Sequence, residues 1–343
     1  MVIERLELAD FRNFAFRELA FSHNRVLFTG PNGSGKTNAL ESIAFLSLLR
    51  SFRNAPAREL IRLGAKHFTL KADIQLRCGK EKLAVREHLS GQRELFIGRA
   101  AVRKSSDFIR EFHCVIFSPE DRLITGGSSG HRRKFFDILI STIEPEYLYR
   151  LARYSRALMQ RNKALKSNPA MAKMFEPELA EQVSTICSKR QFFAGKTVEI
   201  FNRISDNKYD FNISYRPDYP SESDGFLEHL EKTRKKETER CCTLSGPQRD
   251  EFVLTLNGKE LRVFGSTGQI GISSLLLKMT EFELVKNLID LPVIALIDDV
   301  TGELDRQNCD LFLDIIKSAD QRFFTFSKEE NIPELSGIQR IDL

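Results

Sequence analysis

Tryptophan is absent from this 343-residue sequence, and no apolar run approaches the ~20 residues that a membrane-spanning helix needs. The cysteines are scattered, with no C-x-x-C pair among Cys78, Cys114, Cys187, Cys241, Cys242 and Cys309. This spacing argues against a zinc site and against a disulfide framework, and it is typical of a reducing cytosol. Charged residues follow the first methionine too closely for a secretory signal peptide. We therefore expect a cytoplasmic protein that does not enter a membrane.

The chain as a whole also has little excess of charge of either sign. Lys and Arg (52) exceed Asp and Glu (47) by only 5, which identifies no partner by itself. Phenylalanine is abundant, with 27 residues, so we expect a phenylalanine-rich core. The length suggests two domain-sized units.

The clearest motif is Gly30-x4-Gly35-Lys36-Thr37, a phosphate-binding loop. An apolar run at residues 25–28 precedes it and a helix-like run at 40–49 follows it, and this context disfavours a chance glycine-rich turn. Glycines let consecutive N–H groups point at phosphate oxygens, and the following helix directs the positive end of its dipole at the same anion. We predict a nucleotide site with Thr37 on Mg²⁺, formed by Gly30, Asn32, Gly33, Ser34, Gly35, Lys36, Thr37 and Asn38.

A short turn at residues 11–14 comes just before the strand that leads into this loop. Its Arg12 allows two interpretations, an ordinary surface arginine or a contact to the base or phosphates of the nucleotide. We include Arg12 among the predicted nucleotide-binding residues.

An apolar run at residues 292–297 ends in two acids, Asp298 and Asp299. Such a run is typical of a strand buried on both faces, which carries its last residues to the edge of the sheet where a phosphate loop also lies. We expect Asp298 to hold Mg²⁺, through water, and Asp299 to act as the general base that polarises the attacking water. A helix cap is the alternative, but the phosphate loop disfavours it.

A second anion-binding arrangement, Ser266-x-Gly268-Gln269, begins an apolar helix at residues 270–288. Because the phosphate loop already holds one side of the nucleotide, we expect Ser266, Gly268 and Gln269 of one subunit to cap the γ-phosphate held by another. ATP would then join a symmetric homodimer, and hydrolysis would release it. Asp305, in Gly302-Glu303-Leu304-Asp305, is a further expected nucleotide contact.

Three short strands are predicted soon after the first helix, at residues 68–76, 82–88 and 94–97. An antiparallel ribbon in this place is unlike a simple doubly wound kinase and is typical of ATP-binding-cassette heads. The predicted fold class is therefore α/β, a P-loop core of the ATP-binding-cassette type with a mixed sheet and a mainly helical second lobe inserted in the chain.

Basic residues concentrate between His131 and Lys166, where nine of them face three acidic residues. The local excess, 9 − 3 = +6, is larger than the net charge of +5 for the chain. It is the best electrostatic footprint for nucleic acid in the sequence, although solvated helix faces also carry such runs.

A helical hairpin is predicted over the same stretch and beyond it. Its first seam is Leu148, Leu151, Ser155, Leu158, Asn162 and Leu165, and its second is Leu179, Val183, Ile186, Arg190, Phe193, Thr197, Ile200 and Ile204. Residues 166–177 separate the two helices.

Taken in order, these motifs resemble those of the RecF family of recombination-mediator ATPases, which is similar to the SMC-type heads of the ATP-binding-cassette superfamily. The resemblance covers nearly the whole chain. Besides the turn, the loop and the acidic pair, it rests on Phe117-Ser118-Pro119-Glu120-Asp121, Arg132-Arg133-Lys134-Phe135-Phe136-Asp137, Tyr154-Ser155-Arg156, Gln160-Arg161-Asn162-Lys163, Gly246-Pro247-Gln248-Arg249-Asp250 and Ser266-Thr267-Gly268-Gln269.

The resemblance implies a weak, DNA-stimulated ATPase that dimerises on ATP at gapped duplex or single-strand/double-strand junctions. It implies RecO and RecR as protein partners in loading recombinase. It also implies an ATPase core at residues 1–117 and 245–343 (lobe I) and a DNA-binding and dimerisation insertion at 118–244 (lobe II). The implied DNA contacts are Arg132, Arg133, Arg153, Arg156, Arg161 and Lys163.

Three positions depart from the family pattern: Gln248 replaces a histidine, Gly302 replaces a serine, and Ile270 follows the signature glutamine. These changes bear on hydrolysis more than on nucleotide binding. One alternative is therefore an ATP-gated DNA-binding switch with negligible hydrolysis. Another is a transporter-type nucleotide-binding subunit, which predicts a Leu-Ser-Gly-Gly-Gln signature and a histidine after the last strand. Neither is present, since the chain has Ser266-Thr267-Gly268-Gln269 and Phe324-Thr325-Phe326-Ser327.

Overall fold

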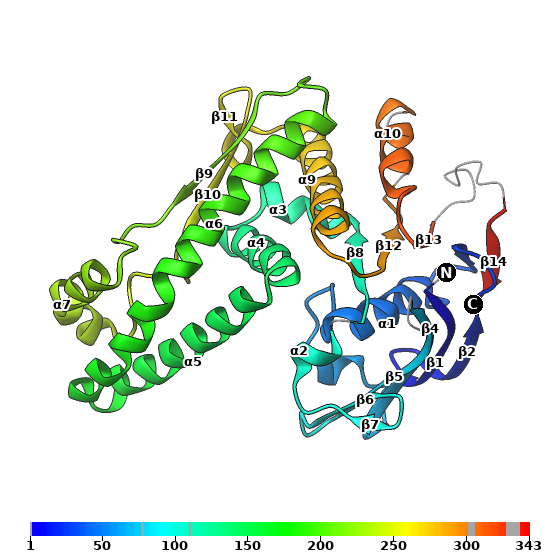
Figure 1. Cartoon of the computed structure of the whole chain (residues 1–343), viewed down its shortest axis with the longest axis horizontal. Coiled ribbons are helices and arrows are strands. Elements are labelled where there is room, and N and C mark those ends of the chain that lie inside the picture. Colours follow the sequence, from blue (N-terminus) through cyan, green and yellow to red (C-terminus); the bar gives the residue numbers. More distant parts are fainter. Residues whose placement is uncertain (1, 77–78, 110, 301–305, 327–336) are drawn as a thin grey trace. The chain divides into compact units, whose positions relative to one another are not determined.

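The computed structural model describes residues 2–76, 79–109, 111–300, 306–326 and 337–343 (Figure 1). The chain forms two compact units, one of Met1–Asp121 with Lys286–Leu343 and the other of Arg122–Val285. Within the described residues, none of the helices combines the length and the apolar character needed to cross a bilayer.

The first unit contains a parallel five-stranded sheet in the order β14-β3-β13-β12-β8. Its strands are β3 (Arg25–Thr29), β8 (His113–Phe117), β12 (Val293–Asp298), β13 (Gln321–Thr325) and β14 (Gln339–Asp342). Every residue of β8 and β12 is buried, as expected for continuous apolar runs in a sheet covered on both faces.

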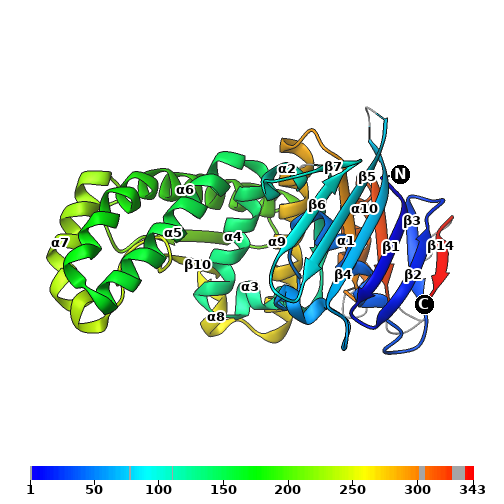
Figure 2. The same cartoon turned by 90° about the horizontal axis from the view of Figure 1, so that it is seen from below.

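A second, antiparallel sheet in the same unit has the strand order β2-β1-β4-β5-β6-β7 (Figure 2). Its strands are β1 (Ile3–Phe11), β2 (Phe14–Ala20), β4 (His67–Leu76), β5 (Gly79–His88), β6 (Arg93–Ile97) and β7 (Ala100–Ala101). The antiparallel ribbon predicted from the sequence is thus confirmed as β4, β5 and β6. The α/β core is confirmed as well, although the expected mixed sheet is in fact two separate sheets, one parallel and one antiparallel.

Helix α1 (Lys36–Leu48) belongs to the hydrophobic core that both sheets share. The apolar side chains of α1 pack with Leu6 and Phe68 of the antiparallel sheet and with Leu296 and Phe323 of the parallel sheet. Its residues 39–47 are therefore all buried, including a glutamate, Glu41. Helix α10 (Arg306–Ile316) connects β12 to β13, with α2 (Ser105–Phe108) elsewhere in this unit.

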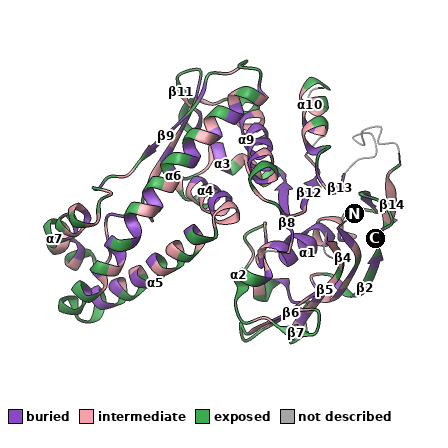
Figure 3. Ribbon diagram, in the orientation of Figure 1, coloured by how far each residue is buried: buried purple, intermediate pink, exposed green. Residues whose placement is uncertain are grey.

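The second unit is mainly helical, as predicted. Its helices are α3 (Arg122–Gly126), α4 (Ser129–Ile143), α5 (Pro145–Ser167), α6 (Glu176–Ile204), α7 (Ser223–Arg240), α8 (Leu261–Phe264) and most of α9 (Thr267–Leu288). A small sheet has the order β11-β10-β9, with β9 at Phe211–Arg216, β10 at Glu251–Leu256 and β11 at Lys259–Glu260. Figure 3 shows buried and exposed residues alternating along the long helices, which is the pattern of elements with one packed face.

The helical hairpin is confirmed as α5 and α6, which flank the 3₁₀ segment Pro169–Phe175. The predicted seam of α6 is buried over residues 179–200. The predicted seam of α5 is wrong by about one residue, because the buried positions are Tyr147, Tyr154, Ala157, Arg161, Ala164 and Leu165. Tyr147, Tyr154 and Arg161 recur every seven residues, so polar groups with buried partners, and not leucines, define this face.

The unit boundaries differ from the predicted lobes in two stretches: residues 118–121 belong to the first unit, and a longer stretch belongs to the second. Residues 245–285 were expected in the core, and they lie in the helical unit. The reason is a pairing distant in sequence: β10 forms an antiparallel ladder with β9, from Glu251 opposite Arg216 to Leu256 opposite Phe211. The role of each unit, ATPase core or DNA-binding insertion, stays a proposal.

Candidate nucleotide-binding site

The phosphate loop joins β3 to α1 and requires its glycines. Gly30, Gly33 and Gly35 have φ angles of +138°, +86° and +112°, which residues with a side chain rarely adopt. A Cβ atom on Gly35 would also lie 2.6 Å from the ring of Phe14. The loop conformation thus depends on glycine both for its backbone angles and for space.

The turn at residues 11–14 packs directly on this loop. The side-chain amide of Asn13 donates to the carbonyl of Ser34 at 2.9 Å and accepts from the amide of Asn38 at 2.8 Å. Asn13 therefore braces the loop from outside. Asn13 was not among the predicted site residues, although it lies beside Arg12 in the turn at residues 11–14.

Arg12 is paired within the protein. Its Nε lies 2.7 Å from Oε2 of Glu41, and its Nη2 lies 2.9 Å from Oε1 of the same carboxylate. The Glu41 side chain is fully buried, and the Arg12 side chain is 19% exposed. A nucleotide contact from Arg12 would require this bidentate pair to open, so the geometry favours a structural role over the expected binding role.

Two groups of the loop lack the partner that a bound phosphate would supply. The Lys36 ammonium donates only to the carbonyls of Gly30 (2.7 Å) and Pro31 (3.1 Å), and no carboxylate among the described residues forms an ion pair with it. The hydroxyl of Ser34 is buried with no hydrogen-bond partner. A buried unpaired donor and an uncompensated cation fit an anion of the size of a phosphate.

The predicted magnesium ligands lie together at the carboxyl end of the parallel sheet. Oδ1 of Asp298 accepts from the hydroxyls of Thr37 at 2.9 Å and Thr325 at 2.6 Å. Burial raises the pKa of Asp298, and the hydrogen bonds from Thr325 and Thr37 oppose that shift. A hydroxyl and a carboxylate oxygen are ligands suited to Mg²⁺, which commonly takes one or two protein carboxylates and completes its shell with phosphate and water.

Thr325 was not predicted as a site residue. It lies directly beside Asp298 in the register of β12 and β13, so the signal was a hydroxyl residue at the end of the neighbouring strand. Asp299, the expected base, follows β12 with a left-handed φ of +53°, and its N–H donates to the carbonyl of Thr325 at 3.0 Å. A left-handed aspartate at the end of a strand is a backbone conformation that functional sites often hold.

The signature residues begin α9 as predicted, and they are exposed. They satisfy one another: the N–H of Gln269 donates to the Ser266 hydroxyl at 3.3 Å, and the N–H of Ser266 donates to Oε1 of Gln269 at 3.0 Å. This is a reciprocal capping box, and Gly268 beside it faces open space. Asp305 and Gly302 lie outside the described residues.

Two of the expected DNA contacts are buried. Arg132 is 2% exposed and pairs with Glu251. Arg161 is fully buried and pairs with Glu176 at 2.9 Å and Glu237 at 2.7 Å. Their charges are neutralised inside the unit, so these two arginines are not available to DNA phosphates in this structure.

The other expected DNA contacts are nearer the surface. Arg153 pairs with Glu178 at 2.6 Å, and Arg133 is half-buried, donating to the carbonyl of Asp250 at 2.8 Å. Arg156 and Lys163 are exposed on α5 and have no ion-pair partner among the described residues. Charge counting thus located the basic helices but did not separate buried from exposed arginines.

A phosphate loop after the first strand of a parallel sheet, with a carboxylate at the end of another strand of that sheet, defines a P-loop nucleotide-binding protein. The family described as RecF/RecN/SMC N terminal domain matches residues 2–337. The DNA replication and repair protein RecF of Halalkalibacterium halodurans is 34% identical, over 97% of this chain and 94% of that protein. RecF of Acetivibrio thermocellus is 32% identical, over 96% and 94%. The chain belongs to the RecF family.

Solved structures agree with this assignment. The recombination mediator protein RecF-ATP in the RecFOR pathway superposes with a TM-score of 0.90 at 26% identity, over 97% of this chain and 93% of that chain. The RecF-ATPrS structure gives 0.89 at 25% identity, over 99% and 95%. An SMC head bound to the winged-helix domain of ScpA gives 0.50 at 14% identity, over 96% and 90%, and so shares the fold. The ATP-binding-cassette core predicted from the sequence is therefore confirmed, and the transporter alternative is not supported.

Proposed function

We propose that this protein is an ATP-dependent recombination mediator, a weak, DNA-stimulated ATPase that dimerises on ATP and binds gapped DNA in the cytoplasm during repair. The observation that carries the proposal is the arrangement at the end of the parallel sheet, where Lys36, the unpaired Ser34 hydroxyl and the Thr37–Asp298 pair converge on one loop. Its RecF relatives are named as DNA replication and repair proteins.

The residues of the loop divide the work on the nucleotide. Lys36 exchanges two carbonyl partners for the β- and γ-phosphate oxygens, and the Ser34 hydroxyl gains an acceptor. Thr37 and Asp298 would hold Mg²⁺, Asp298 through water, and the ion would neutralise charge on the phosphates. Asp299 orients the attacking water and accepts its proton.

Dimerisation uses the exposed start of α9. In a homodimer, Ser266, Gly268 and Gln269 of one subunit cap the γ-phosphate held by the other, because a helix start binds anions. The hydrogen bonds between Ser266 and Gln269 must break for this contact, so that the two residues bond to the nucleotide instead of to each other. RecO- and RecR-type proteins are the expected mediator partners.

DNA contact is assigned to the accessible cations of the helical unit. Arg156 and Lys163 lie seven residues apart and both are exposed on α5, so they share one face of the helix. We assign backbone contacts at single-strand/double-strand junctions or gapped duplex to these two residues and to Arg133 and Arg153. Arg132 and Arg161 are left out because they are buried in ion pairs.

Sedimentation velocity with and without Mg-ATP and a gapped duplex tests the proposal. We expect a monomer alone, a dimer with ATP, and a larger complex with ATP and DNA. A protein that stays monomeric with saturating ATP contradicts the dimer, and one that binds no gapped DNA contradicts the mediator role.

Asp299→Asn separates an ATPase from a nucleotide-gated switch. Loss of turnover with unchanged ATP affinity supports Asp299 as the base. Turnover equal to that of the wild type removes Asp299 from that role and favours the switch.

A further inference from the structure

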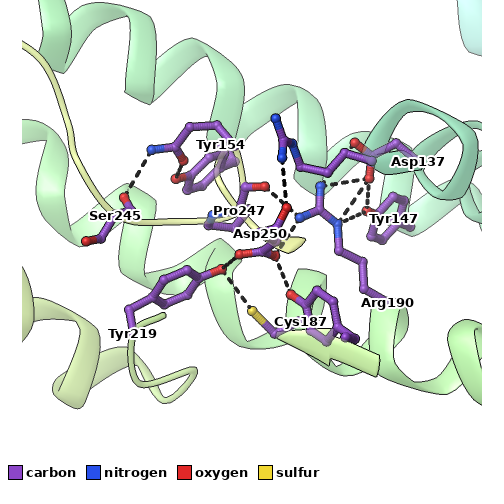
Figure 4. Close-up of polar contacts among 12 residues, drawn as sticks. Asp137, Tyr147, Tyr154, Cys187, Arg190, Tyr219, Ser245, Pro247 and Asp250 are labelled. Carbon is purple, nitrogen blue, oxygen red and sulfur yellow. Dashed lines mark hydrogen bonds and ion pairs between the residues drawn. The ribbon is translucent and has the colours of Figure 1, made fainter. Parts of the chain in front are cut away.

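The loop at residues 245–250 is held from beneath by a buried polar network (Figure 4). The Asp250 carboxylate, which is 1% exposed, accepts from Arg190 at 2.6 Å, from Tyr219 at 2.7 Å and from Tyr215. Arg190 also donates to the carbonyl of Pro247 at 2.7 Å. Asp250 is therefore fixed through three side chains that come from α6, β9 and the segment after β9.

The rest of the loop is pinned as well. The Tyr154 hydroxyl donates to Gln248, whose amide donates to the carbonyl of Ser245 at 3.0 Å. The Ser245 hydroxyl is in turn hydrogen-bonded to His229 at 2.8 Å. Gly246 has a φ of +128°, and a Cβ there would collide with the Tyr154 hydroxyl. Gln248, which departs from the family pattern, has a structural role in this unit.

Among the polar side chains of the loop, that of Arg249 has no bonding partner in the described residues. It is exposed, and no hydrogen bond or ion pair of its side chain exists within the described part of the chain. Only its backbone N–H is bonded, to the carbonyl of Gly246 at 2.8 Å. An arginine that only contacts water does not require a backbone fixed by a buried network, because surface loops usually tolerate exposed side chains on mobile backbone.

Arg133 is a second arginine beside this loop that forms no ion pair with a described residue. Its Nη1 donates to the carbonyl of Asp250 at 2.8 Å, which puts its guanidinium next to the residue that follows Arg249. No carboxylate among the described residues forms an ion pair with it. Burial and the charge of Arg190 lower the pKa of Arg133, and the charges of Glu251, Asp250 and Asp137 oppose that shift. Arg249 and Arg133 thus form no ion pair with a described residue, and Arg133 contacts the residue that follows Arg249. Two other arginines of this region, Arg190 and Arg132, are both paired.

We propose that Arg249 and Arg133 form a two-arginine clamp for a phosphate of the nucleic-acid backbone, and that the network around Asp250 is the rigid base of this clamp. The clamp rests on the DNA-binding role proposed above and adds a residue, Arg249, to it. Guanidinium groups present paired N–H donors that match phosphate oxygens. A rigid backbone reduces the ordering cost of such a contact.

The test is fluorescence anisotropy with a labelled gapped duplex, over a series of salt concentrations. Arg249→Ala and Arg133→Ala are compared with Arg240→Ala, which removes an exposed arginine from the end of α7 in the same unit. In each clamp variant we expect about tenfold weaker binding at low salt and a log–log salt slope reduced by about 1. The Arg240→Ala variant should match the wild type in both, and all variants should keep the wild-type thermal shift with Mg-ATP.

The outcomes separate the clamp from the proposed function. Wild-type protein that binds no DNA overturns both. Wild-type protein that binds DNA, with an unchanged salt slope in either clamp variant, overturns the two-arginine clamp and leaves the mediator role standing. An equal loss in Arg240→Ala also overturns it, because the effect would then be one of overall charge. Because Arg249 is exposed, its replacement should not impair folding, and a change in DNA affinity would report a lost contact.

Discussion

Replacing Arg161 with methionine is expected to unfold the helical unit at lower temperature and not to act through lost DNA contact. Arg161 and Glu237 are both 0% exposed and lie 2.7 Å apart, and Glu176 and the Thr243 hydroxyl complete the set at 2.9 and 2.7 Å. Methionine keeps much of the volume but none of the charge. Glu237 would then be a buried carboxylate without its cation.

The magnitude follows from the burial. Removing one partner of a buried ion pair costs about 3–5 kcal/mol, because the other charge remains in the interior. For a unit of this size, Arg122–Val285, each kcal/mol lowers the melting temperature by about 2–4 °C. The Arg161→Met variant should therefore melt roughly 6–20 °C below the wild type. Adding Glu237→Gln should recover part of the loss, since it removes the stranded charge.

Thermal unfolding followed by circular dichroism checks this, with Arg156→Met as the matched control. Arg156 is exposed on the same helix, so its replacement should change stability by no more than about 0.5 kcal/mol and should weaken DNA binding. An Arg161→Met protein that melts within about 2 °C of the wild type yet binds DNA weakly would refute the reasoning and restore Arg161 as a DNA contact.

Three further predictions concern the nucleotide-binding unit. At an ATP concentration 100 times its Kd, the free energy of unfolding of the wild-type protein should rise by about 2.7 kcal/mol. The Lys36→Ala variant should show almost none of this stabilisation in differential scanning fluorimetry. An equal stabilisation of both proteins would remove Lys36 from the site. Burial raises the pKa of Asp298, which disfavours its charged form in the folded state, so Asp298→Asn should melt higher than the wild type in Mg²⁺-free buffer at neutral pH and lose the Mg²⁺-dependent part of the ATP shift. That difference should shrink as the pH falls toward 4, because the carboxyl group then becomes neutral, and a lower melting temperature at neutral pH would contradict it. Arg12→Ala should lower the free energy of unfolding by about 2 kcal/mol or more, because Glu41 is left buried and unpaired. Arg62→Ala, which breaks an exposed pair with Asp10, should lower it by less than about 1 kcal/mol. Equal losses in chemical denaturation would show that Arg12 is not a buried structural partner.

The sequence was sufficient where one local pattern decides the structure. Continuous apolar runs predicted buried parallel strands, and alternation predicted the antiparallel ribbon. The spacing of glycines, Lys36 and Thr37 placed the phosphate loop correctly. The acidic pair after an apolar run could be placed at the same edge, since parallel strands end together.

The rest depended on contacts between residues distant in the chain. The seam of α5 was misplaced because its buried positions are Tyr147, Tyr154 and Arg161, which are polar, and only their partners on other elements make burial favourable. Arg161 was assigned to DNA from the basic stretch and the family resemblance, and neither reveals its buried partners Glu176 and Glu237. Residues 245–285 group with the helical unit, and the sequence did not indicate this because nothing local shows that β10 pairs with β9.

The single proton of the Thr37 hydroxyl has a consequence for the order in which ligands enter. That proton is directed at Asp298. While this hydrogen bond is kept, Thr37 presents its lone pairs toward the phosphate loop, and lone pairs attract a cation and not a phosphate oxygen. We therefore expect ATP that already carries its metal to be a better ligand of this site than free ATP.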